Sequence, residues 1–487
     1  MSGIGGYARA TPEATALVSM GRSLTFEDLD ARQRRLAGAL AGAGLGEGDR
    51  IAVLARNSVE SLEVTTGALR AGLIPVPVNP LLTEPEAAYV ISDSRSTWLF
   101  TDRPTEGLPE LDAVVTFGDA YERLLAESDP TDVCDHVRGR PMHYTSGTTG
   151  SPKGVWVRPV KARKAAQMST DFRNYWGLTE DDIHLVCSPL AHSAPHRYAM
   201  RTLEAGGTVA IQSRFDPAET LAAIDLFNAT TTFMVPTHLE RILALGERTV
   251  RRHDLSSLRL LIHAGAPIRD ETKRKTIEMF PADSVWEFYG STEGQATRIS
   301  AAEWLRKPGS VGRPREGAEI LITDEMGTVL ASGEVGTVWI KDPRIEKFQY
   351  WRDRAKTRRT WKAGAFTVGD LGYLDENGYL FLAGRAHDTI ITGGVNVYPQ
   401  EVEGVLAQHP AVAEVVVYGM PNEEWGQEVH AAVVPAGDLD TDELLEWTRS
   451  RLAGFKRPRH VEIVAELART PTGKLKREPP EAPTAAE

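Results

Sequence analysis

The alternation of short apolar runs with amphipathic segments is the feature that most constrains the fold of this chain. An apolar run at 49–55 precedes an amphipathic segment at 59–70, and a second run at 73–78 follows it. Similar apolar runs recur farther along, at 183–188, 207–212, 231–235 and 258–263. Short buried strands that alternate with helices form mostly parallel sheets with helices on both faces. The pattern therefore predicts an α/β fold for the larger part of the chain.

The pattern changes after Gly309. Short runs separated by turn residues, at 309–314, 318–323, 333–340 and 378–383, predict a β-rich subdomain. About 100 residues follow Arg385, a plausible size for a separate domain, with apolar runs at 413–418 and 430–435. An amphipathic segment at 440–452, which we expect Thr441 to cap, completes a small α+β unit. We therefore divide the chain into a large domain at 1–385 and a small domain at 386–487.

Composition narrows the class of protein and its partners. The net charge of −12 argues against a nucleic-acid partner, because phosphate backbones attract basic surfaces. The two cysteines, Cys134 and Cys187, provide neither a disulfide framework nor a zinc-binding set, which suits a reducing compartment. No apolar run approaches the ~18 residues of a membrane span, and the first residues of the sequence lack a basic region that leads into an apolar one. We expect a soluble, cytoplasmic protein without a membrane partner.

The loop Tyr144–Gly154 is the strongest motif. Its eleven residues include three glycines, five Ser or Thr hydroxyls and Lys153. Glycines let a backbone approach a ligand closely, and the exposed N–H groups and hydroxyls form a nest for anionic oxygens. The spacing differs from a Walker A loop, because Pro152 stands where that motif needs its second glycine. The loop therefore predicts a polyphosphate site, and the alternative is an ordinary surface loop between two strands.

The order and length of this loop resemble the phosphate-binding loop of the adenylate-forming superfamily. That superfamily includes acyl-CoA and aryl-CoA synthetases, adenylation domains and luciferase-like enzymes. The resemblance extends almost end to end, including the segments 23–29 and 79–83. It implies ATP, Mg²⁺ and CoA as cofactors and co-substrates. It also implies that phosphate oxygens are held by Thr145, Ser146, Gly147, Thr148, Thr149 and Lys153.

The segment Phe288–Glu293 is the second strong signal. An aromatic residue before a glycine at a strand end can offer a flat face to a purine base. Glu293 provides a carboxylate, and Mg²⁺ usually binds one or two carboxylates together with substrate phosphates. By resemblance, Tyr289 stacks on adenine, Gly290 is a further nucleotide-binding residue, Thr292 contacts the α-phosphate and Glu293 holds the metal. The alternative is an ordinary turn with a solvated glutamate.

The segment His263–Pro267 ends an expected strand in small residues. Open α/β sheets bind ligands at the carboxyl ends of their strands. By resemblance, Gly265 and Ala266 border both adenine and the acyl pocket. The signal is weak without the other motifs.

Asp370 and Arg385 are the expected ribose clamp. A carboxylate can accept hydrogen bonds from both ribose hydroxyls, and a guanidinium can donate to hydroxyl or phosphate oxygens. The resemblance gives both residues this role. As isolated residues they would more often form a surface ion pair.

Lys474 lies close to the end of the chain, within the basic segment 469–476. A cation at the pentacovalent phosphorus stabilises mainly the transition state, and the resemblance gives Lys474 this role. The alternative is a solvated lysine in a basic tail. The resemblance also implies that the small domain rotates about His387 between an adenylation pose and a thioester-forming pose. Gly393 and Gly394 would then line the pantetheine tunnel.

The segment 189–196 resembles the one whose aromatic residue or histidine gates the carboxylate pocket, which gives His192 a catalytic position. Ala191 stands where a bulky aromatic residue is usual, so we expect a wide pocket and a bulky, apolar acid. His192 and His196 are four residues apart, a spacing that can bind metal on a helix. We do not expect a zinc site, because zinc sites take at least three protein ligands.

These observations predict an ATP-dependent, AMP-forming carboxylic acid:CoA ligase. Its partners are the acid, ATP and CoA, with a carrier protein and a second copy of the chain left open. Trp156, Val368 and His387 depart from the usual pattern, so one alternative is a partial ligase that mainly converts a supplied acyl-adenylate. Further alternatives are an enzyme that loads a carrier protein and a non-catalytic nucleotide sensor.

Overall fold

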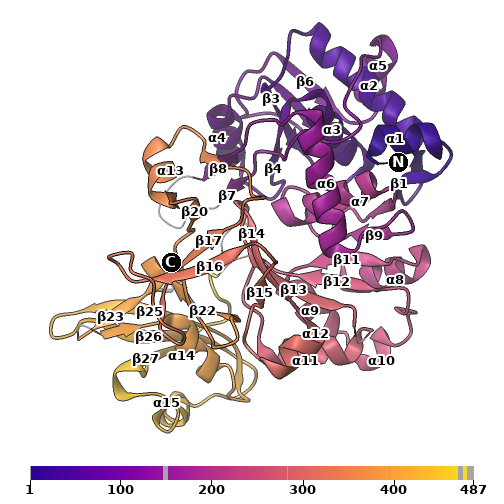
Figure 1. The fold of residues 1–487 in the computed structure, drawn as a ribbon. Helices are drawn as coiled ribbons and strands as arrows, with labels where there is room; N and C mark the ends of the chain where they lie inside the picture. The colour runs from indigo at the N-terminus through magenta and orange to yellow at the C-terminus, as the bar shows by residue number, and fades with distance from the viewer. Residues whose placement is uncertain (1, 146–151, 282, 394, 470–474, 480–487) are drawn as a thin grey trace, which may run out of the picture. The chain divides into compact units, whose positions relative to one another are not determined.

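The computed structural model describes residues 2–145, 152–281, 283–393, 395–469 and 475–479. The chain forms two compact units, shown with their elements in Figure 1. The first consists of Met1–Pro308 with Pro343–Arg359, and the second consists of Gly309–Asp342 with Thr360–Glu487. The predicted boundary at Arg385 stays a prediction.

A long sheet forms the centre of the first unit. Its strands follow the order β14-β13-β12-β11-β9-β10-β1-β2, and the pairs from β13 to β1 are parallel. The bounds are β1 Thr15–Ser19, β2 Arg22–Thr25, β9 Ile183–Val186, β10 Thr208–Ile211, β11 Thr231–Met234, β12 Leu260–His263, β13 Val285–Gly290 and β14 Gln295–Ser300.

Helices cover both faces of this sheet, which explains why its strands are continuous apolar runs. In β12, Leu261 packs into one buried cluster, and Leu260 and Ile262 pack into another. The helices are α6 Ala162–Trp176, α7 Ser193–Ala205, α8 Pro217–Phe227, α9 Pro236–Leu243, α10 Glu247–Val250, α11 Asp270–Met279 and α12 Ala301–Arg306. The predicted α/β fold is confirmed.

A smaller parallel sheet lies between β2 and β9 in sequence, with the strand order β4-β3-β5-β6. Its strands are β3 Arg50–Leu54, β4 Ile74–Val78, β5 Trp98–Thr101 and β6 Ala113–Thr116. The associated helices are α1 Ile4–Ala10, α2 Phe26–Gly42, α3 Val59–Ala71, α4 Glu84–Ser94 and α5 Asp119–Glu127. The Thr25 hydroxyl accepts a hydrogen bond from the Asp28 N–H, so a capping box fixes the start of α2.

Three short strands complete the first unit. β7 Tyr144–Thr145 pairs with β8 Lys153–Trp156, and β8 pairs in turn with β18 Gln349–Tyr350. Because β18 lies far along the chain, this sheet brings the segment after residue 343 into the first unit. The helix α13 Arg354–Thr360 follows β18.

The second unit begins with an antiparallel sheet in the order β19-β20-β17-β21-β22, with β16 beside β17. Its strands are β16 Glu319–Thr323, β17 Gly336–Lys341, β19 Trp361–Lys362, β20 Ala365–Phe366, β21 Asp370–Leu374 and β22 Leu380–Arg385, and β15 Arg313–Pro314 precedes them. The predicted β-rich region is confirmed.

The end of the chain folds around a second sheet in the order β24-β23-β26-β25, with β27 parallel to β26. Its elements are η1 Ala386–Asp388, β23 Ile390–Thr392, β24 Val395–Val397, α14 Pro399–Leu406, β25 Val412–Asn422, β26 Gly426–Pro435, α15 Thr441–Arg449, η2 Gly454–Lys456 and β27 His460–Ile463. The expected cap at Thr441 is wrong. The Asp440 carboxylate accepts from the N–H groups of Asp442 and Glu443, which makes Thr441 the first helical residue.

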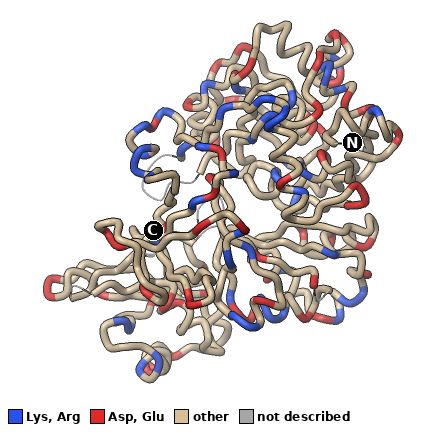
Figure 2. The backbone as a smooth tube through the Cα atoms, in the orientation of Figure 1, with Lys and Arg blue, Asp and Glu red and all other residues tan. Residues whose placement is uncertain are grey.

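Basic and acidic side chains are interspersed along both units, as Figure 2 shows for a chain of net charge −12. Within the described ranges, no helix has the length and apolarity needed to cross a membrane.

Candidate active site

The two ends of the glycine-rich loop form a hairpin. β7 and β8 pair Tyr144 with Gly154 and Thr145 with Lys153, and the Thr145 hydroxyl donates to the Lys153 carbonyl at 3.4 Å. A Cβ at Gly154 would lie 3.1 Å from both the Met142 sulfur and the Tyr144 ring, so the hairpin favours glycine there. Four of the expected phosphate-binding residues lie outside the described ranges, namely Ser146, Gly147, Thr148 and Thr149.

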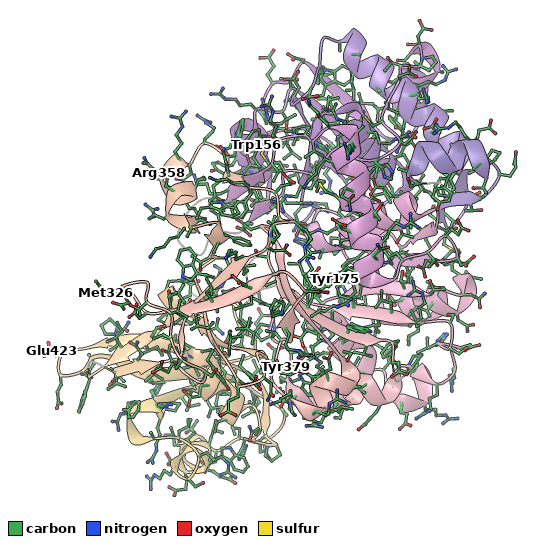
Figure 3. All side chains as sticks on the ribbon, in the orientation of Figure 1. Trp156, Tyr175, Met326, Arg358, Tyr379 and Glu423 are labelled. Carbon is green, nitrogen blue, oxygen red and sulfur yellow. The ribbon has the colours of Figure 1, made fainter. Side chains whose placement is uncertain are left out.

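Trp156 supports this hairpin. Its ring, labelled in Figure 3, lies 6.1 Å from the Trp351 ring, centroid to centroid. Trp351 donates from its backbone N–H to the Gly154 carbonyl at 2.7 Å and from its indole N–H to the Asp93 carbonyl at 2.8 Å. The unusual tryptophan after the loop therefore packs against the residue that follows β18.

The Phe288–Glu293 segment ends β13 and enters a tight turn to β14. Ser291 donates from its N–H to the Gly294 carbonyl at 2.9 Å. A Cβ at Gly290 would lie 2.7 Å from the same carbonyl oxygen, so the turn requires glycine there. Glu293 is only 4% exposed, and its carboxylate accepts a hydrogen bond from the Tyr350 hydroxyl at 2.7 Å. Burial with a fixed donor rules out the solvated glutamate that the sequence left open.

Arg140 holds the backbone of this turn. Its Nη1 donates to the carbonyls of Thr292 at 2.7 Å and Glu293 at 3.0 Å, and its buried Nη2 has no partner among the described residues. Burial, together with the nearby charge of Arg197, lowers the pKa of Arg140 to about 9 against the opposing effect of Glu293. The guanidinium therefore stays charged at neutral pH and has one donor available.

Two more polar atoms in the turn are buried without a partner among the described residues, the Ser291 hydroxyl and Nε2 of Gln295. Together with Nη2 of Arg140, they leave three donor groups without a partner in or against the turn that contains Glu293. Buried polar groups normally have partners, so this donor set fits an anionic ligand such as phosphate. Within the same ranges, no group of three or more His, Cys, Asp and Glu side chains could hold a metal ion. Glu293 alone suits Mg²⁺, which takes much of its coordination from phosphate and water.

The sequence motifs missed Arg140 and Tyr350. Arg140 precedes the loop in a stretch without periodicity, and Tyr350 lies in a strand of two residues. Neither position has a local signal, because each belongs to the site only through contacts with residues far away in sequence.

The histidines of the 189–196 segment differ in their surroundings. His192 is the N-cap residue of α7, and Thr292 lies close to the next residue, with 3.3 Å between its Oγ1 and the Ser193 Oγ. His196 is buried, with Nε2 2.9 Å from the Thr65 hydroxyl. Its ring also lies 6.0 Å from the ring of His143. The structure therefore places His192 beside the Thr292 turn, whereas His196 belongs to the interior.

Tyr289 and the Gly265–Ala266 pair lie at one edge of the central sheet. β12 and β13 are parallel, with His263 opposite Glu287, so Gly265 continues the register toward Tyr289. Gly265 has a φ of 96°, which favours glycine, and both Gly265 and Ala266 are exposed. This is the carboxyl edge, where open α/β sheets bind ligands.

Five histidines of the first unit, four of them buried and His238 partly buried, have pKa values below the usual range. Burial is the main cause, and the pKa falls to about 4 for His184 and His238 and to about 3 for His196. The direction is the same for His143 and His263. All five are uncharged in the folded chain at neutral pH.

We expect the free energy of unfolding to fall as the pH drops from about 6.5, the pKa of histidine in an unfolded chain. Below that pH the unfolded chain binds protons that the folded chain cannot. Each histidine then lowers the free energy of unfolding by up to about 1.4 kcal/mol per pH unit. Burial raises the pKa of Glu63 to about 6 and also raises the pKa of Glu287, and these two carboxyl groups oppose the trend. Urea unfolding at pH 7.5, 6.5 and 5.5 measures the slope of the free energy of unfolding against pH. His184→Gln should reduce it and exposed His460→Gln should not, whereas equal slopes in all three proteins would contradict the assignment.

In the second unit, Asp370 and Arg385 face each other across β21 and β22. Arg385 Nε lies 3.2 Å from an Asp370 carboxylate oxygen. The Arg385 side chain is 35% exposed, so it can also reach a ligand. The pair has the geometry of an ion pair, and its role as a ribose clamp stays a prediction.

His387 belongs to a chain of charged groups in the second unit. Its Nε2 lies 3.3 Å from one Asp388 oxygen, and Arg477 Nη1 lies 3.2 Å from the other. Arg477 also pairs with Glu403 at 2.8 Å. Although burial opposes it, these two carboxylates raise the pKa of Arg477. The expected pivot is therefore tied to the end of the chain; Lys474 lies outside the described residues.

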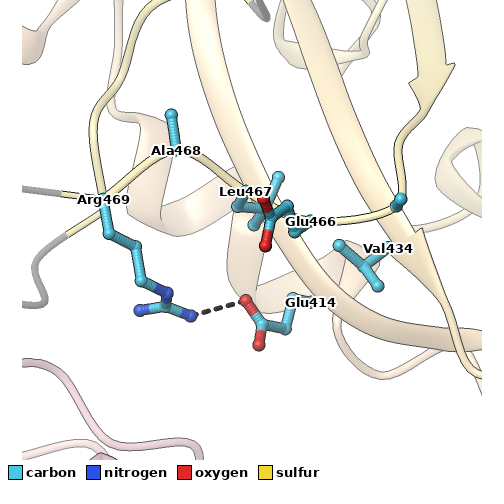
Figure 4. A pocket seen from close by; sticks show the side chains of 7 residues that line it. Glu414, Val434, Glu466, Leu467, Ala468 and Arg469 are labelled. Atoms are coloured by element: carbon cyan, nitrogen blue, oxygen red, sulfur yellow. Dashed lines mark hydrogen bonds and ion pairs between the residues drawn. The ribbon is translucent and has the colours of Figure 1, made fainter.

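We expect Arg477→Gln to lower the free energy of unfolding of the second unit by about 2 kcal/mol, because two part-buried carboxylates lose their partner. The matched control is Arg469→Gln. Arg469 pairs with Glu414 at 2.6 Å at the rim of a pocket of about 380 Å³ (Figure 4), where both side chains are over one-third exposed. That change should cost under about 1 kcal/mol. Urea unfolding followed by circular dichroism compares the two, and equal losses would contradict the proposed importance of Arg477.

Gly393 has a structural explanation. Its φ is 56°, its N–H donates to the Trp425 carbonyl at 2.8 Å, and a Cβ there would lie 2.8 Å from the Trp425 ring. Packing against Trp425 therefore accounts for this glycine, and a role beside pantetheine stays a prediction. Gly394 lies outside the described residues.

Comparison with known proteins adds independent evidence. The sequence model of the AMP-binding enzyme family matches residues 6–350, and that of the AMP-binding enzyme C-terminal domain matches residues 401–474. The chain is 33% identical to a fatty acid–[acyl-carrier-protein] ligase, ScoC, of Streptomyces coeruleorubidus, over 97% of this chain and 93% of that protein. It is 35% identical to a feruloyl-CoA synthase of an Amycolatopsis species, over 96% of this chain and 95% of that protein.

A solved structure has the same fold. The o-succinylbenzoate coenzyme A synthetase MenE of Bacillus subtilis, in complex with AMP, aligns with a TM-score of 0.87 at 28% identity and covers 99% of this chain and 98% of that one. The family resemblance seen in the loop and in the Phe288–Glu293 segment is thereby confirmed. The chain belongs to the AMP-binding enzyme family of the adenylate-forming superfamily.

Proposed function

We propose that this chain is an ATP-dependent, AMP-forming carboxylic acid:CoA ligase. The observation that carries the proposal is the Glu293 turn. It combines a buried carboxylate held by Tyr350 with unused donors on Arg140, Ser291 and Gln295. This arrangement suits a metal–polyphosphate ligand. Relatives named as CoA ligases, and a MenE structure with ATP and a magnesium ion, support the assignment.

The reaction has two steps. A carboxylate oxygen of the acid attacks the α-phosphorus of ATP, which forms the acyl–phosphate bond and releases pyrophosphate. The thiolate of CoA then attacks the acyl carbon and expels AMP. Bound Mg²⁺ would neutralise charge on the phosphates, and Glu293 would be the residue that holds it.

The residues of this chain orient the phosphates and stabilise developing charge. Thr292 donates its hydroxyl to the α-phosphate, and Arg140 fixes the Thr292 and Glu293 carbonyls and adds Nη2 as a donor. Thr145 and Lys153 hold the outer phosphates together with the loop between them. Asp370 and Arg385 hold the ribose, Lys474 assists the first step, and His387 is the pivot, as the family resemblance implies.

The acid is bulky. The family resemblance puts a bulky aromatic residue at the position of Ala191, whose smaller side chain would leave a wider pocket. Relatives named for feruloyl-CoA, 2-succinylbenzoate and indoleacetate support a bulky acid. Preference for acetate or another small acid would contradict this part of the proposal.

A second candidate is an enzyme that loads the acid onto a carrier protein, which the similarity to ScoC favours.

Mass spectrometry of reactions with ATP, Mg²⁺ and a panel of acids separates the candidates. Acyl-AMP without acceptor, converted to acyl-CoA when CoA is added, supports the ligase. Transfer only to a phosphopantetheinylated carrier supports the second candidate. A supplied acyl-adenylate that reacts with CoA, when acid plus ATP does not, identifies a partial ligase. Bound ATP without any product contradicts all three.

A further inference from the structure

His238 lies at the carboxyl edge of the central sheet. The parallel strands β9 and β11 are neighbours, Ser188 follows β9, and His238 is in the first turn of α9, directly after β11. Nδ1 of His238 lies 3.3 Å from the Ser188 hydroxyl. His192 follows β9 at the same edge and caps α7. Because ligands bind at this edge in open α/β sheets, His238 is placed where an acid would lie.

Ser188 determines the tautomer of His238. The Ser188 hydroxyl donates its single proton to the Phe233 carbonyl at 3.0 Å. Toward His238 the same oxygen can therefore only accept, so Nδ1 carries the hydrogen. In the neutral ring Nε2 is then an acceptor, and among the described residues it has no hydrogen-bond partner.

The ring of His238 is also held in place. It stacks on the Phe215 ring with 3.8 Å between centroids and 5° between planes, and the Arg241 guanidinium lies 5.2 Å from the Phe215 ring. Burial, followed by the charges of Arg241 and His192, lowers the pKa of His238 to about 4. The ring is therefore neutral at pH 7, and its acceptor points in one fixed direction.

We propose that His238 determines substrate specificity by accepting a hydrogen bond from the acid, and that the preferred acids are bulky and carry a hydroxyl group. This inference rests on the proposed ligase function. A neutral histidine whose other nitrogen is bound to Ser188 can recognise a donor but offers nothing to an ether or a hydrocarbon. The residue is a specificity determinant and takes no part in the adenylation chemistry.

The test compares matched acids in one enzyme preparation. The probes are 4-hydroxycinnamate, 4-methoxycinnamate and cinnamate, together with 8-hydroxyoctanoate and octanoate. In whichever of the two sets reacts faster, the cinnamates or the octanoates, we expect kcat/KM to be about tenfold higher for the hydroxylated acid. A tenfold ratio corresponds to one good hydrogen bond. The ratio between two acids does not depend on how much of the enzyme is folded, so it separates recognition from stability.

Three variants complete the test. His238→Phe keeps a ring to stack on Phe215 and removes the acceptor, so the ratio should fall to about one. His238→Gln retains an acceptor oxygen and should keep part of the preference. His253→Phe is the control, because His253 lies before β12, toward the opposite edge of the sheet, and it should keep the full ratio.

The outcomes distinguish the inference from the function on which it rests. No acyl-AMP or acyl-CoA from any acid would overturn the proposed function itself. Ligase activity without preference for the hydroxyl, or a preference that His238→Phe leaves intact, would overturn the role of His238 alone. Equal values of kcat/KM for the methoxy acid and the hydroxy acid would show that the enzyme does not recognise a hydrogen-bond donor on the substrate.

Discussion

Replacing Glu293 by glutamine should lower the rate of acyl-AMP formation by about 100- to 1,000-fold, the usual effect of removing one group that stabilises transition-state charge. The substitution removes the negative charge that we propose binds the metal ion. It keeps an oxygen that can accept from the Tyr350 hydroxyl, so the turn should stay folded. Pyrophosphate release at saturating acid, measured across a Mg²⁺ titration, gives the rate.

The matched control for Glu293 is Tyr350→Phe, which keeps the carboxylate and removes only its hydrogen-bond donor. We expect a loss of about tenfold, with a higher Mg²⁺ concentration at half-maximal rate, because the ligand is less well oriented. Equal rates for wild type and Glu293→Gln at every Mg²⁺ concentration would show that this carboxylate is not the metal ligand.

Replacing Arg140 by methionine should have a comparable effect on the rate, about 100-fold, and should also destabilise the protein. Two carbonyls lose charge-assisted hydrogen bonds, at about 1.5–3 kcal/mol each at most. The proposed phosphate site also loses the donor at Nη2. Thermal unfolding measures the first effect, and the KM for ATP together with the rate of acyl-AMP formation measures the second.

Two variants separate the functions of Arg140. Arg140→Lys keeps the charge but cannot bind both carbonyls and a ligand at once, so part of the rate loss should remain. Arg56→Met removes an arginine that is 63% exposed and pairs with Asp102, so both readouts should match the wild type. An Arg140→Met enzyme with reduced stability and an unchanged KM for ATP would limit Arg140 to a structural role.

The order of strands and helices was predictable from the sequence because both faces of the parallel sheets are buried. The run at 258–263, for example, becomes β12 with Leu260–His263 all buried. Motifs whose residues are contiguous, such as Phe288–Glu293, could be recognised because a single strand end and the turn that follows it contain all of their residues. The cap of α15 was misplaced by one residue, because Asp440 and Thr441 are both good caps and only the backbone distinguishes them.

Residues that act through distant contacts could not be predicted. Arg140 reaches the Glu293 turn across the fold, Tyr350 reaches it from a two-residue strand, and His238 depends on the proton of Ser188. None of these relations leaves a periodic or spaced pattern in the sequence. These contacts depend on which strands become neighbours, and the packing of the whole unit determines that order.

The pairing of β8 with β18 has a consequence for how this protein is made. A ribosome adds about 5–20 residues per second, so β18 emerges roughly 10 to 40 s after β8. Until then β8 has an open edge, and Glu293 lacks the Tyr350 hydroxyl as its hydrogen-bond donor. The chain also leaves the first unit at Pro308 and re-enters it at Pro343. A fragment that stops at Pro308 should therefore expose an unpaired strand to other nascent chains, and the first unit, when it is expressed alone, needs residues 343–359 supplied in the same chain or as a separate peptide.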